Sequence, residues 1–181
     1  MTVLPIRTAP DPVLQKKVRR VTKIDAAIQR LIDDMFETMY EAHGVGLAAN
    51  QVGAPLRICV LGIPKGEGEG RDEYVLINPE WVKKGGEREV DEGCLSIPGY
   101  RGRLTRSEWV KVKGLDRDGN AVRLKGEGLL AQALEHELDH LDGSLYVDRM
   151  KEQGTLETLH EIGAGESVEG PAPNEAASAA G

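Results

Sequence analysis

The segment at residues 127–142 limits the fold more than any other, because it combines a helical hydrophobic pattern with two histidines four residues apart. The apolar stripe consists of Leu130, Leu134, Leu138 and Leu141, and the polar stripe of Gln132, Glu135, Asp139 and Asp142. His136 and His140 lie on a further face, beside Leu129 and Ala133. The leucine stripe and the histidine face are both unsuited to solvent, which predicts a helix that runs through the core against a sheet. The polar stripe, with Asp139, is expected to face solvent.

His136, Glu137 and His140 have the spacing His-Glu-x-x-His. Residues four apart lie on one face of a helix, so both imidazoles can bind the same ion. Glu137 lies slightly to the side, close enough to contact a water at the ion without binding the ion itself. The alternative is a helix with two core histidines and an unrelated glutamate. Two imidazoles do not complete a catalytic metal site, so a third ligand is required.

Several positions compete for this third ligand. The extended pattern His-Glu-x-x-His-x-x-Gly-x-x-His needs a further histidine where this chain has Tyr146. Glu157 or Glu161 as the third ligand would make the protein a zinc endopeptidase. Cys94, within DEGCLSIPGYRG, offers a thiolate, which binds zinc or ferrous iron well. We expect Cys94 in a tight Glu-Gly-Cys turn, and Cys59 as a small buried hydrophobic residue.

Three segments of the chain read GVGLAANQ (44–51), EGCLS (92–96) and HELDH (136–140). In this order and spacing they resemble the three signature motifs of peptide deformylases, and the resemblance extends from about residue 10 to about residue 149. Asn50 stands where proline is common in that family, and Glu135 where glutamine is common. Neither position is a metal ligand in the family pattern.

The resemblance implies a metal-dependent hydrolase that removes the formyl group from the N-terminal formylmethionine of newly made polypeptides and releases formate. Its metal ligands would be Cys94, His136 and His140, and Glu137 would act first as general base and then as general acid. One divalent ion per chain is implied, with ferrous iron as the physiological ion. Purified protein is expected to hold zinc as well, because a Cys–His₂ shell binds zinc more tightly. A purely structural metal is disfavoured, since structural sites have four ligands.

The resemblance also implies residues that bind the oxyanion and the substrate. Gln51 and the backbone N–H of Leu95 would hold the oxyanion, although an ordinary turn residue is the alternative for Gln51. The substrate backbone would pair with Gly44, Val45 and Gly46, where glycines leave room for another chain. Arg101, seven residues after the cysteine, is expected either to bind a peptide carbonyl or carboxylate, or to be a surface charge.

The remaining sequence predicts the rest of the fold. Helices are expected at 11–18 and at 25–42, the second ended by Gly44, with a short helix within 147–162. Strands are expected at 57–63 and 74–79, and hairpins at 81–90 and 109–126. We predict one catalytic domain of the α+β class at residues 1–162, with small, mostly antiparallel sheets packed around a buried metal-bearing helix. Residues 163–181 are expected to form a disordered acidic tail.

Charge and hydropathy narrow the class of partner. The 181-residue chain has a net charge of −7, which opposes general nucleic-acid binding. A basic cluster near the N-terminus, Lys16, Lys17, Arg19 and Arg20, is expected to be a solvated face. No apolar run approaches the ~20 residues of a membrane span, the N-terminus lacks a signal pattern, and two cysteines make no disulfide framework. We expect a cytoplasmic protein that acts on formyl-methionyl nascent peptides, with transient ribosome association and with neither a specific nucleic acid nor a membrane as partner.

Overall fold

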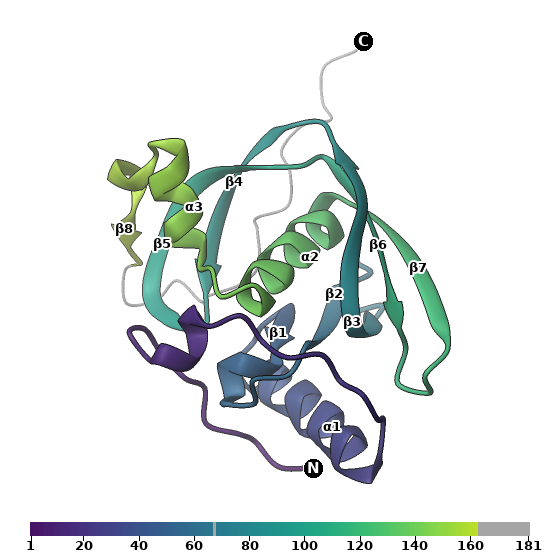
Figure 1. Ribbon diagram of the computed structural model, residues 1–181. Helices are drawn as coiled ribbons and strands as arrows, with labels where there is room; N and C mark the ends of the chain where they lie inside the picture. The colour runs from purple at the N-terminus through teal and green to yellow at the C-terminus, as the bar shows by residue number, and fades with distance from the viewer. Residues whose placement is uncertain (67, 163–181) are drawn as a thin grey trace.

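Figure 1 shows the computed structural model, which describes residues 1–66 and 68–162. The helices are η1 (Pro12–Gln15), α1 (Ala26–Glu41), η2 (Ala49–Val52), α2 (Gly128–Leu141), α3 (Tyr146–Gln153) and η3 (Leu156–Thr158), where η marks a 3₁₀ helix. The strands are β1 (Gly46–Ala48), β2 (Ile58–Pro64), β3 (Arg71–Gly85), β4 (Arg88–Cys94), β5 (Ile97–Arg106), β6 (Trp109–Leu115), β7 (Ala121–Glu127) and β8 (His160–Glu161).

Two antiparallel sheets enclose the helix α2. One sheet has five strands in the order β1-β2-β3-β6-β7, and the other has three in the order β4-β5-β8. Figure 1 shows α2 between them, with β4 and β5 on one side and β2 and β3 on the other. The predicted α+β class, with small antiparallel sheets around a buried helix, is confirmed.

The helix α2 occupies almost the range that its periodicity predicts. Glu127 precedes its first residue and Asp142 follows its last one. Its apolar stripe packs against the inward-facing Val110 and Val112 of β6 in one buried cluster. Gly143 then adopts a φ of 80°, which favours glycine, and the chain turns away. The interior position of this helix is therefore a consequence of its continuous leucine stripe.

The helix α1 begins as predicted but ends differently. The Asp25 carboxylate caps its start by accepting hydrogen bonds from the N–H groups of Ala27 and Ile28. The prediction that Gly44 ends the helix is wrong in detail, because His43 takes the left-handed conformation with a φ of 55°. The Gly44 N–H then donates to the carbonyl of Met39 at 2.8 Å, which closes the helix end. A shorter helix also replaces the one expected at 11–18, since only η1 forms there.

One predicted hairpin is confirmed and the other is wrong. The hairpin at 109–126 exists as β6 and β7, with Val112 opposite Leu124. Residues 81–90 do not form a hairpin, because residues 81–85 continue β3 while Arg88 opens β4 in the other sheet. Gly86, with a φ of 70°, lies at the corner between the two sheets. A glycine pair between two strands fits a hairpin and a corner equally well, which explains the error.

The turn beside Cys94 lies one step later than predicted. The segment from Glu92 to Cys94 is the end of β4 and pairs with β5, so it is not a tight turn. The reversal occurs at Leu95 and Ser96, and Cys94 pairs with Ile97. The cysteine is therefore held at the end of a strand, directly after a register shift between Gly93 and Cys94.

The described chain closes with α3, η3 and β8, so the short helix expected within 147–162 is present as α3. The disordered tail expected at 163–181 lies outside the described residues. In the described part of the chain, no helix has both the length and the apolar character that a membrane crossing requires.

Candidate metal centre and active site

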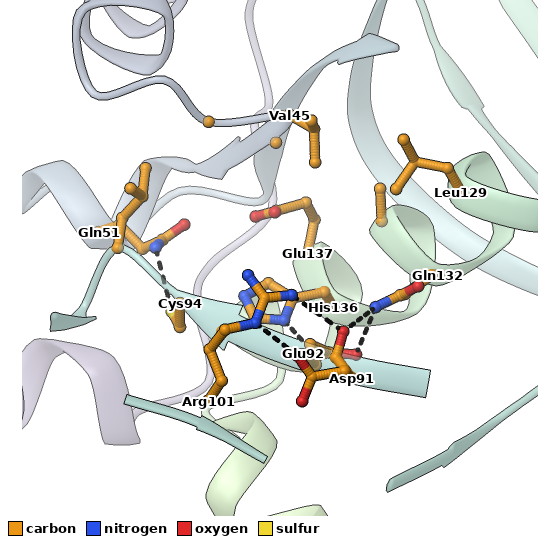
Figure 2. A pocket seen from close by; sticks show the side chains of 15 residues that line it. Val45, Gln51, Asp91, Glu92, Cys94, Arg101, Leu129, Gln132, His136 and Glu137 are labelled. Carbon is orange, nitrogen blue, oxygen red and sulfur yellow. Dashed lines mark hydrogen bonds and ion pairs between the residues drawn. The ribbon is translucent and has the colours of Figure 1, made fainter. Parts of the chain in front are cut away.

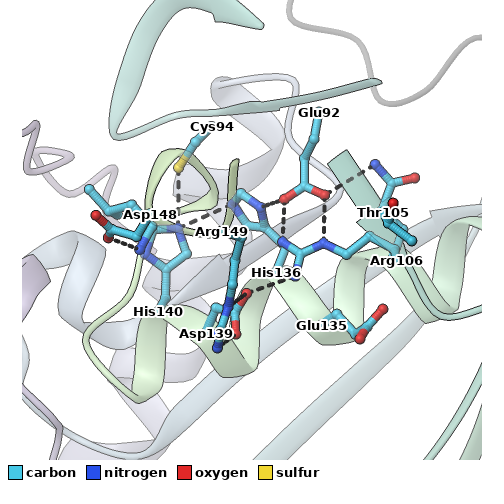
Figure 3. A network of polar contacts seen from close by, with 12 residues as sticks. Glu92, Cys94, Thr105, Arg106, Glu135, His136, Asp139, His140, Asp148 and Arg149 are labelled. Carbon is cyan, nitrogen blue, oxygen red and sulfur yellow. Dashed lines mark hydrogen bonds and ion pairs between the residues drawn. The ribbon is translucent and has the colours of Figure 1, made fainter. Parts of the chain in front are cut away.

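Three side chains with metal-binding atoms meet between β4 and α2. The Cys94 Sγ lies 3.2 Å from the His140 Nε2, which lies 3.1 Å from the His136 Nε2. All three atoms lie within 4.8 Å of one another. Figure 3 shows Cys94 above the two imidazoles, which belong to successive turns of α2. The strand end and the helix thus bring together the three residues that the sequence singled out.

The competing candidates for the third ligand lie elsewhere. Glu157 and Glu161 are exposed, in η3 and β8, and neither belongs to the group formed by the three donors. The ring of Tyr146 stacks on His136, and its hydroxyl donates to the carbonyl of Tyr100 at 3.2 Å. Neither carboxylate nor the phenol therefore takes part in this group.

A carboxylate fixes the orientation of His136. The His136 Nδ1 lies 2.5 Å from the Glu92 Oε1, so its Nε2 is directed toward Cys94 and His140. Glu92 is itself held by two hydrogen bonds from Arg106, at 2.6 and 3.0 Å. A carboxylate behind a metal-binding histidine fixes the tautomer and the ring orientation. Burial alone would raise the pKa of Glu92, but the positive charges of Arg106 and His136 outweigh burial and lower it to about 2.

Gln132, Glu135 and Asp139 of the polar stripe of α2 are buried, so their predicted exposure is wrong, whereas Asp142 is exposed as predicted. Asp139 is buried, accepts from the Arg106 Nη1 at 2.7 Å, and accepts from the Arg149 Nη2 at 2.7 Å. Glu135, also buried, accepts from the Ser107 N–H at 2.7 Å. The sheet of β4 and β5 covers these carboxylates and supplies an arginine, so burial and ion pairing replace solvation.

The donor set and its surroundings suit a cation. Burial by itself lowers the pKa of His136, but the negative charges of Cys94 and Glu92 outweigh it and raise the pKa well above its ordinary value. Surroundings that raise the pKa of His136 in this way also favour a bound cation. The His140 Nδ1 is buried without a hydrogen-bond partner among the described residues, so no such partner fixes this ring. One thiolate and two imidazoles are a donor set suited to zinc or ferrous iron.

Glu137 lies beside this group without entering it. Its side chain is only 3% exposed, and its Oε2 has no hydrogen-bond partner among the described residues. Burial raises the pKa of Glu137 to about 7. A Cβ atom on Gly46 would overlap the Glu137 Oε1, so the glycine makes room for the carboxylate. Figure 2 shows the side chain of Glu137 between Val45 and His136.

Gln51, in η2, presents its amide nitrogen to the same pocket. The Ala48 N–H donates to the Gln51 Oε1 at 2.9 Å, which assigns the other end of the amide as the donor. This Nε2 donates to the Ser96 Oγ at 3.1 Å and lies 3.7 Å from the Cys94 Sγ. The Arg7 N–H also donates to the backbone carbonyl of Gln51 at 2.7 Å. The glutamine is therefore buried and fixed at both its backbone and its side chain.

One pocket joins these residues to the expected substrate-binding segment (Figure 2). Of the ten residues that the sequence singled out for the site, all except His140 line it: Gly44, Val45, Gly46, Gln51, Cys94, Leu95, Arg101, His136 and Glu137. The Arg101 Nε donates to the Asp91 Oδ2 at 2.6 Å at the pocket wall. The strand β1 forms one edge of its sheet, and in the described residues no strand pairs with its outer side.

Comparisons with known proteins identify the family of the chain. The family model of polypeptide deformylase matches residues 3–155. The chain belongs to the peptide deformylase family. A peptide deformylase from Dehalococcoides mccartyi (strain CBDB1) is 55% identical, over 90% of this chain and 93% of the relative.

Solved structures show the same fold. A peptide deformylase from Legionella pneumophila has a TM-score of 0.77 and 44% identity, over 86% of this chain and 94% of that one. A Met-Ala-Ser-bound class I type b peptide deformylase from Acinetobacter baumannii has a TM-score of 0.76 and 33% identity, over 82% and 98%.

Membership of the family gives the activity. This deformylase is a metal-dependent hydrolase that removes the N-formyl group from the N-terminal formylmethionine of newly made polypeptides and releases formate. The endopeptidase alternative is therefore wrong, in keeping with the exposed positions of Glu157 and Glu161.

Sequence reasoning missed several residues of this deformylase site. Glu92 holds His136, Arg106 in turn holds Glu92, and Leu129 and Gln132 line the pocket beside them. A signal for Arg106 was present, because Gly102 and Leu104 precede it at alternate positions of β5 and all three are buried. The two-residue period of a strand would have placed this arginine on the inward face.

Proposed function

We propose that Cys94, His136 and His140 hold the metal ion of this deformylase, that Glu137 transfers protons, and that Gln51 and the backbone N–H of Leu95 hold the oxyanion. The observation that carries this proposal is the convergence of one sulfur and two nitrogens within 4.8 Å on the wall of the pocket that Glu137 and Gln51 also line. A divalent ion held by these three residues would lower the pKa of water and polarise the formyl oxygen.

The substrate backbone pairs with the open edge of β1. Gly44 and Val45 lead into this strand, and Gly46 begins it. Main-chain hydrogen bonds to a sheet edge hold an extended peptide without regard to its sequence. The apolar groups of Val45, Leu129 and Ala133 line the pocket, so the methionine side chain lies against them. Arg101 lies at the same wall and is placed to contact a carbonyl of the peptide.

Glu137 moves the proton that the reaction requires. Its buried carboxylate accepts a proton from the attacking water, and the water oxygen forms a bond to the formyl carbon. The same group then returns the proton to the amine nitrogen as the carbon–nitrogen bond breaks. Burial raises the pKa of this carboxyl group above its ordinary value, which suits it both to accept a proton and to return it.

Gln51 and Leu95 stabilise the charge that develops on the formyl oxygen. The Gln51 amide is neutral, and its carbonyl end is already occupied by the Ala48 N–H, so only N–H donors face the pocket. Leu95 lies in the turn after Cys94 and lines the pocket as well. Fixed donors cost no reorganisation as the charge forms, which is why they lower the barrier.

Ferrous iron is proposed as the physiological ion, and zinc as an ion that the purified protein can hold. A Cys–His₂ donor set binds zinc more tightly by the general affinity order. Zinc readily stays four-coordinate, whereas ferrous iron more readily accepts an additional oxygen ligand. We therefore propose that the ferrous form is the faster enzyme.

The setting of the reaction is proposed from its substrate. Newly made polypeptides exist where translation occurs, so we propose a cytoplasmic enzyme that associates transiently with ribosomes. The two buried, free cysteines suit a reducing compartment. We also propose that residues 1–162 act as one catalytic unit, because the site combines residues of β1, η2, β4 and α2.

Removal and return of the metal tests the proposal. Formate release from a formyl-methionyl peptide is measured after treatment with a chelator, and again after anaerobic addition of ferrous iron or of zinc. Loss of turnover and its recovery are expected, with the higher rate for iron. Turnover that survives complete metal removal would contradict the proposed site, and a faster zinc enzyme would contradict the proposed ion alone.

A further inference from the structure

The outer face of the five-stranded sheet carries a row of three lysines that do not line the pocket. Lys83 of β3 lies opposite Lys111 of β6, and Lys111 lies opposite Lys125 of β7. All three are exposed, while the alternate residues Val110 and Val112 point inward. Neighbouring strands are ~4.8 Å apart, so the row spans about 10 Å across three strands.

A second row lies beside the first on the same face. Lys113 of β6 lies opposite Glu80 of β3 and Arg123 of β7. Glu80 accepts from Lys113 at 3.1 Å and from Arg20 at 2.5 Å. Arg123 lines two adjacent hollows of this face, one with Lys113 and the other with Lys111 and Lys125. We call these residues the basic face: Arg20, Lys83, Lys111, Lys113, Arg123 and Lys125, with Glu80 and Glu127 as its two carboxylates.

Ion pairing does not explain this arrangement. Within residues 1–66 and 68–162, no ion pair involves Lys83, Lys111 or Arg123. Like charges directly opposite each other destabilise a sheet. The ammonium groups of Lys83 and Lys111 lie 5.9 and 6.0 Å from the centre of the Trp109 ring, which offsets a part of this repulsion. Three cations without ion pairs on one exposed face of an acidic protein suit an anion supplied from outside.

We propose that the basic face binds the phosphate backbone of single-stranded RNA. Its charge is complementary to phosphate, and an exposed row across three strands suits an extended chain that can follow it. The net charge of −7 does not prevent this contact, because charges are screened beyond ~8 Å at physiological salt. RNA is preferred to other polyanions because the substrate is made on an RNA-rich particle, and this choice rests on the proposed ribosome association. None of the residues of the basic face lines the catalytic pocket, so both surfaces can be used together.

Salt dependence of RNA binding tests the proposal. The probe is a fluorescein-labelled oligouridine of about 20 nucleotides, and its fluorescence anisotropy is followed with the full chain. Lys83, Lys111 and Arg123 would contact one phosphate each. Three such contacts predict that affinity falls roughly 20-fold between ~50 and ~200 mM salt. In the variant Lys111→Gln/Arg123→Gln one contact remains, so the same change of salt lowers affinity only about threefold.

The matched control removes two positive charges elsewhere. Lys16 and Lys17 follow η1, which lies on the other side of the molecule from the β6–β7 hairpin (Figure 1). The variant Lys16→Gln/Lys17→Gln should bind RNA as the unaltered protein does. Both variants should release formate from a free formyl-methionyl peptide at the normal rate, which also shows that they fold.

Three results would overturn the proposal while leaving the deformylase site intact. These are absence of RNA binding at ~50 mM salt, an equal loss of binding in the control variant, and tighter binding to anionic phospholipid vesicles or to polyglutamate than to RNA. A lower rate on free peptide in the Lys111→Gln/Arg123→Gln variant alone would also overturn it, because the basic face would then belong to catalysis.

Discussion

On the β4–α2 wall of the pocket charged side chains hold one another in place, whereas on the β1–η2 wall the groups are neutral and mostly backbone. The first wall contains the ion pairs of Glu92, Arg106 and Asp139 behind the imidazoles. The second wall consists of a strand edge that begins at Gly46 and the amide of Gln51. We call them the metal wall and the substrate wall.

Because of this difference, substitutions on the two walls should have different effects on the enzyme. A buried charge that loses its partner is strongly destabilised, so the metal wall is expected to tolerate little change without loss of the ion. The neutral wall holds no ligand atom, so its residues can change while the ion stays bound. Changes on the metal wall should therefore alter metal content, and changes on the substrate wall should alter turnover alone.

The largest effect is expected for Cys94→Ala. Removal of the only sulfur ligand should leave the protein without its ion and without formate release. The matched control is Cys59→Ala, since Cys59 is also buried but burial raises the pKa of its thiol and keeps it protonated. Metal content by elemental analysis should fall in the first variant and not in the second. A tightly held ion in Cys94→Ala protein would contradict the role of Cys94 as a ligand, and with it the contrast between the two walls.

Glu137→Gln is expected to retain the ion and lose turnover by about 10²–10⁴, the usual value of a general base. Glutamine has nearly the same shape but cannot accept the proton. Elemental analysis and formate release are measured on the same sample. A loss of less than tenfold would mean that another group moves the proton.

Gln51→Leu should lower kcat by about 10²–10³ while the ion and the fold remain, because one oxyanion donor is lost. Ser96 and Ala48 lose their side-chain partner as well, so the melting temperature is measured beside the kinetics. An effect on KM alone would show that Gln51 binds the substrate in its ground state and does not stabilise the oxyanion.

The smallest effect is expected for Glu92→Gln, which should weaken the affinity for metal about 10–100-fold through the orientation of His136. Glu135→Gln is the control, since Glu135 is a buried carboxylate on α2, beside His136 in sequence, that contacts Ser107 and not a histidine. Competition with a chromophoric chelator measures both affinities. Equal affinities for metal in the two variants would contradict the proposal that Glu92 orients the His136 ring.

The residues that sequence reasoning found and those it missed differ in how far they lie in sequence from their partners in the site. His136, Glu137 and His140 lie within one turn and a half of a helix, so their spacing alone placed them together. Cys94 was found through its chemistry and the resemblance to a family, because its separation from α2 in the sequence does not tell where it lies relative to that helix. Helical periodicity cannot tell whether a polar stripe meets water or arginine, which is why Asp139 was placed in solvent.

The errors in the fold have a similar origin. The corner at Gly86 and a hairpin turn share the same local signals, and only the pairing of β3 with β6 distinguishes them. Likewise, His43 ends α1 in a conformation that glycine usually takes. The prediction chose Gly44 because it is the nearest glycine. Sheet partners and helix ends depend on contacts that no short window of sequence contains.

X-ray absorption at the edge of the bound metal tests the central claim most directly, because it counts the sulfur and nitrogen neighbours of the ion. With zinc bound, the account predicts one sulfur at about 2.3 Å and two imidazole nitrogens at about 2.0–2.1 Å. The sulfur should persist in Cys59→Ser protein and be absent from any ion retained by Cys94→Ser protein. A spectrum of the unaltered protein without sulfur, or a sulfur that disappears in Cys59→Ser protein, would contradict the assignment of the metal wall.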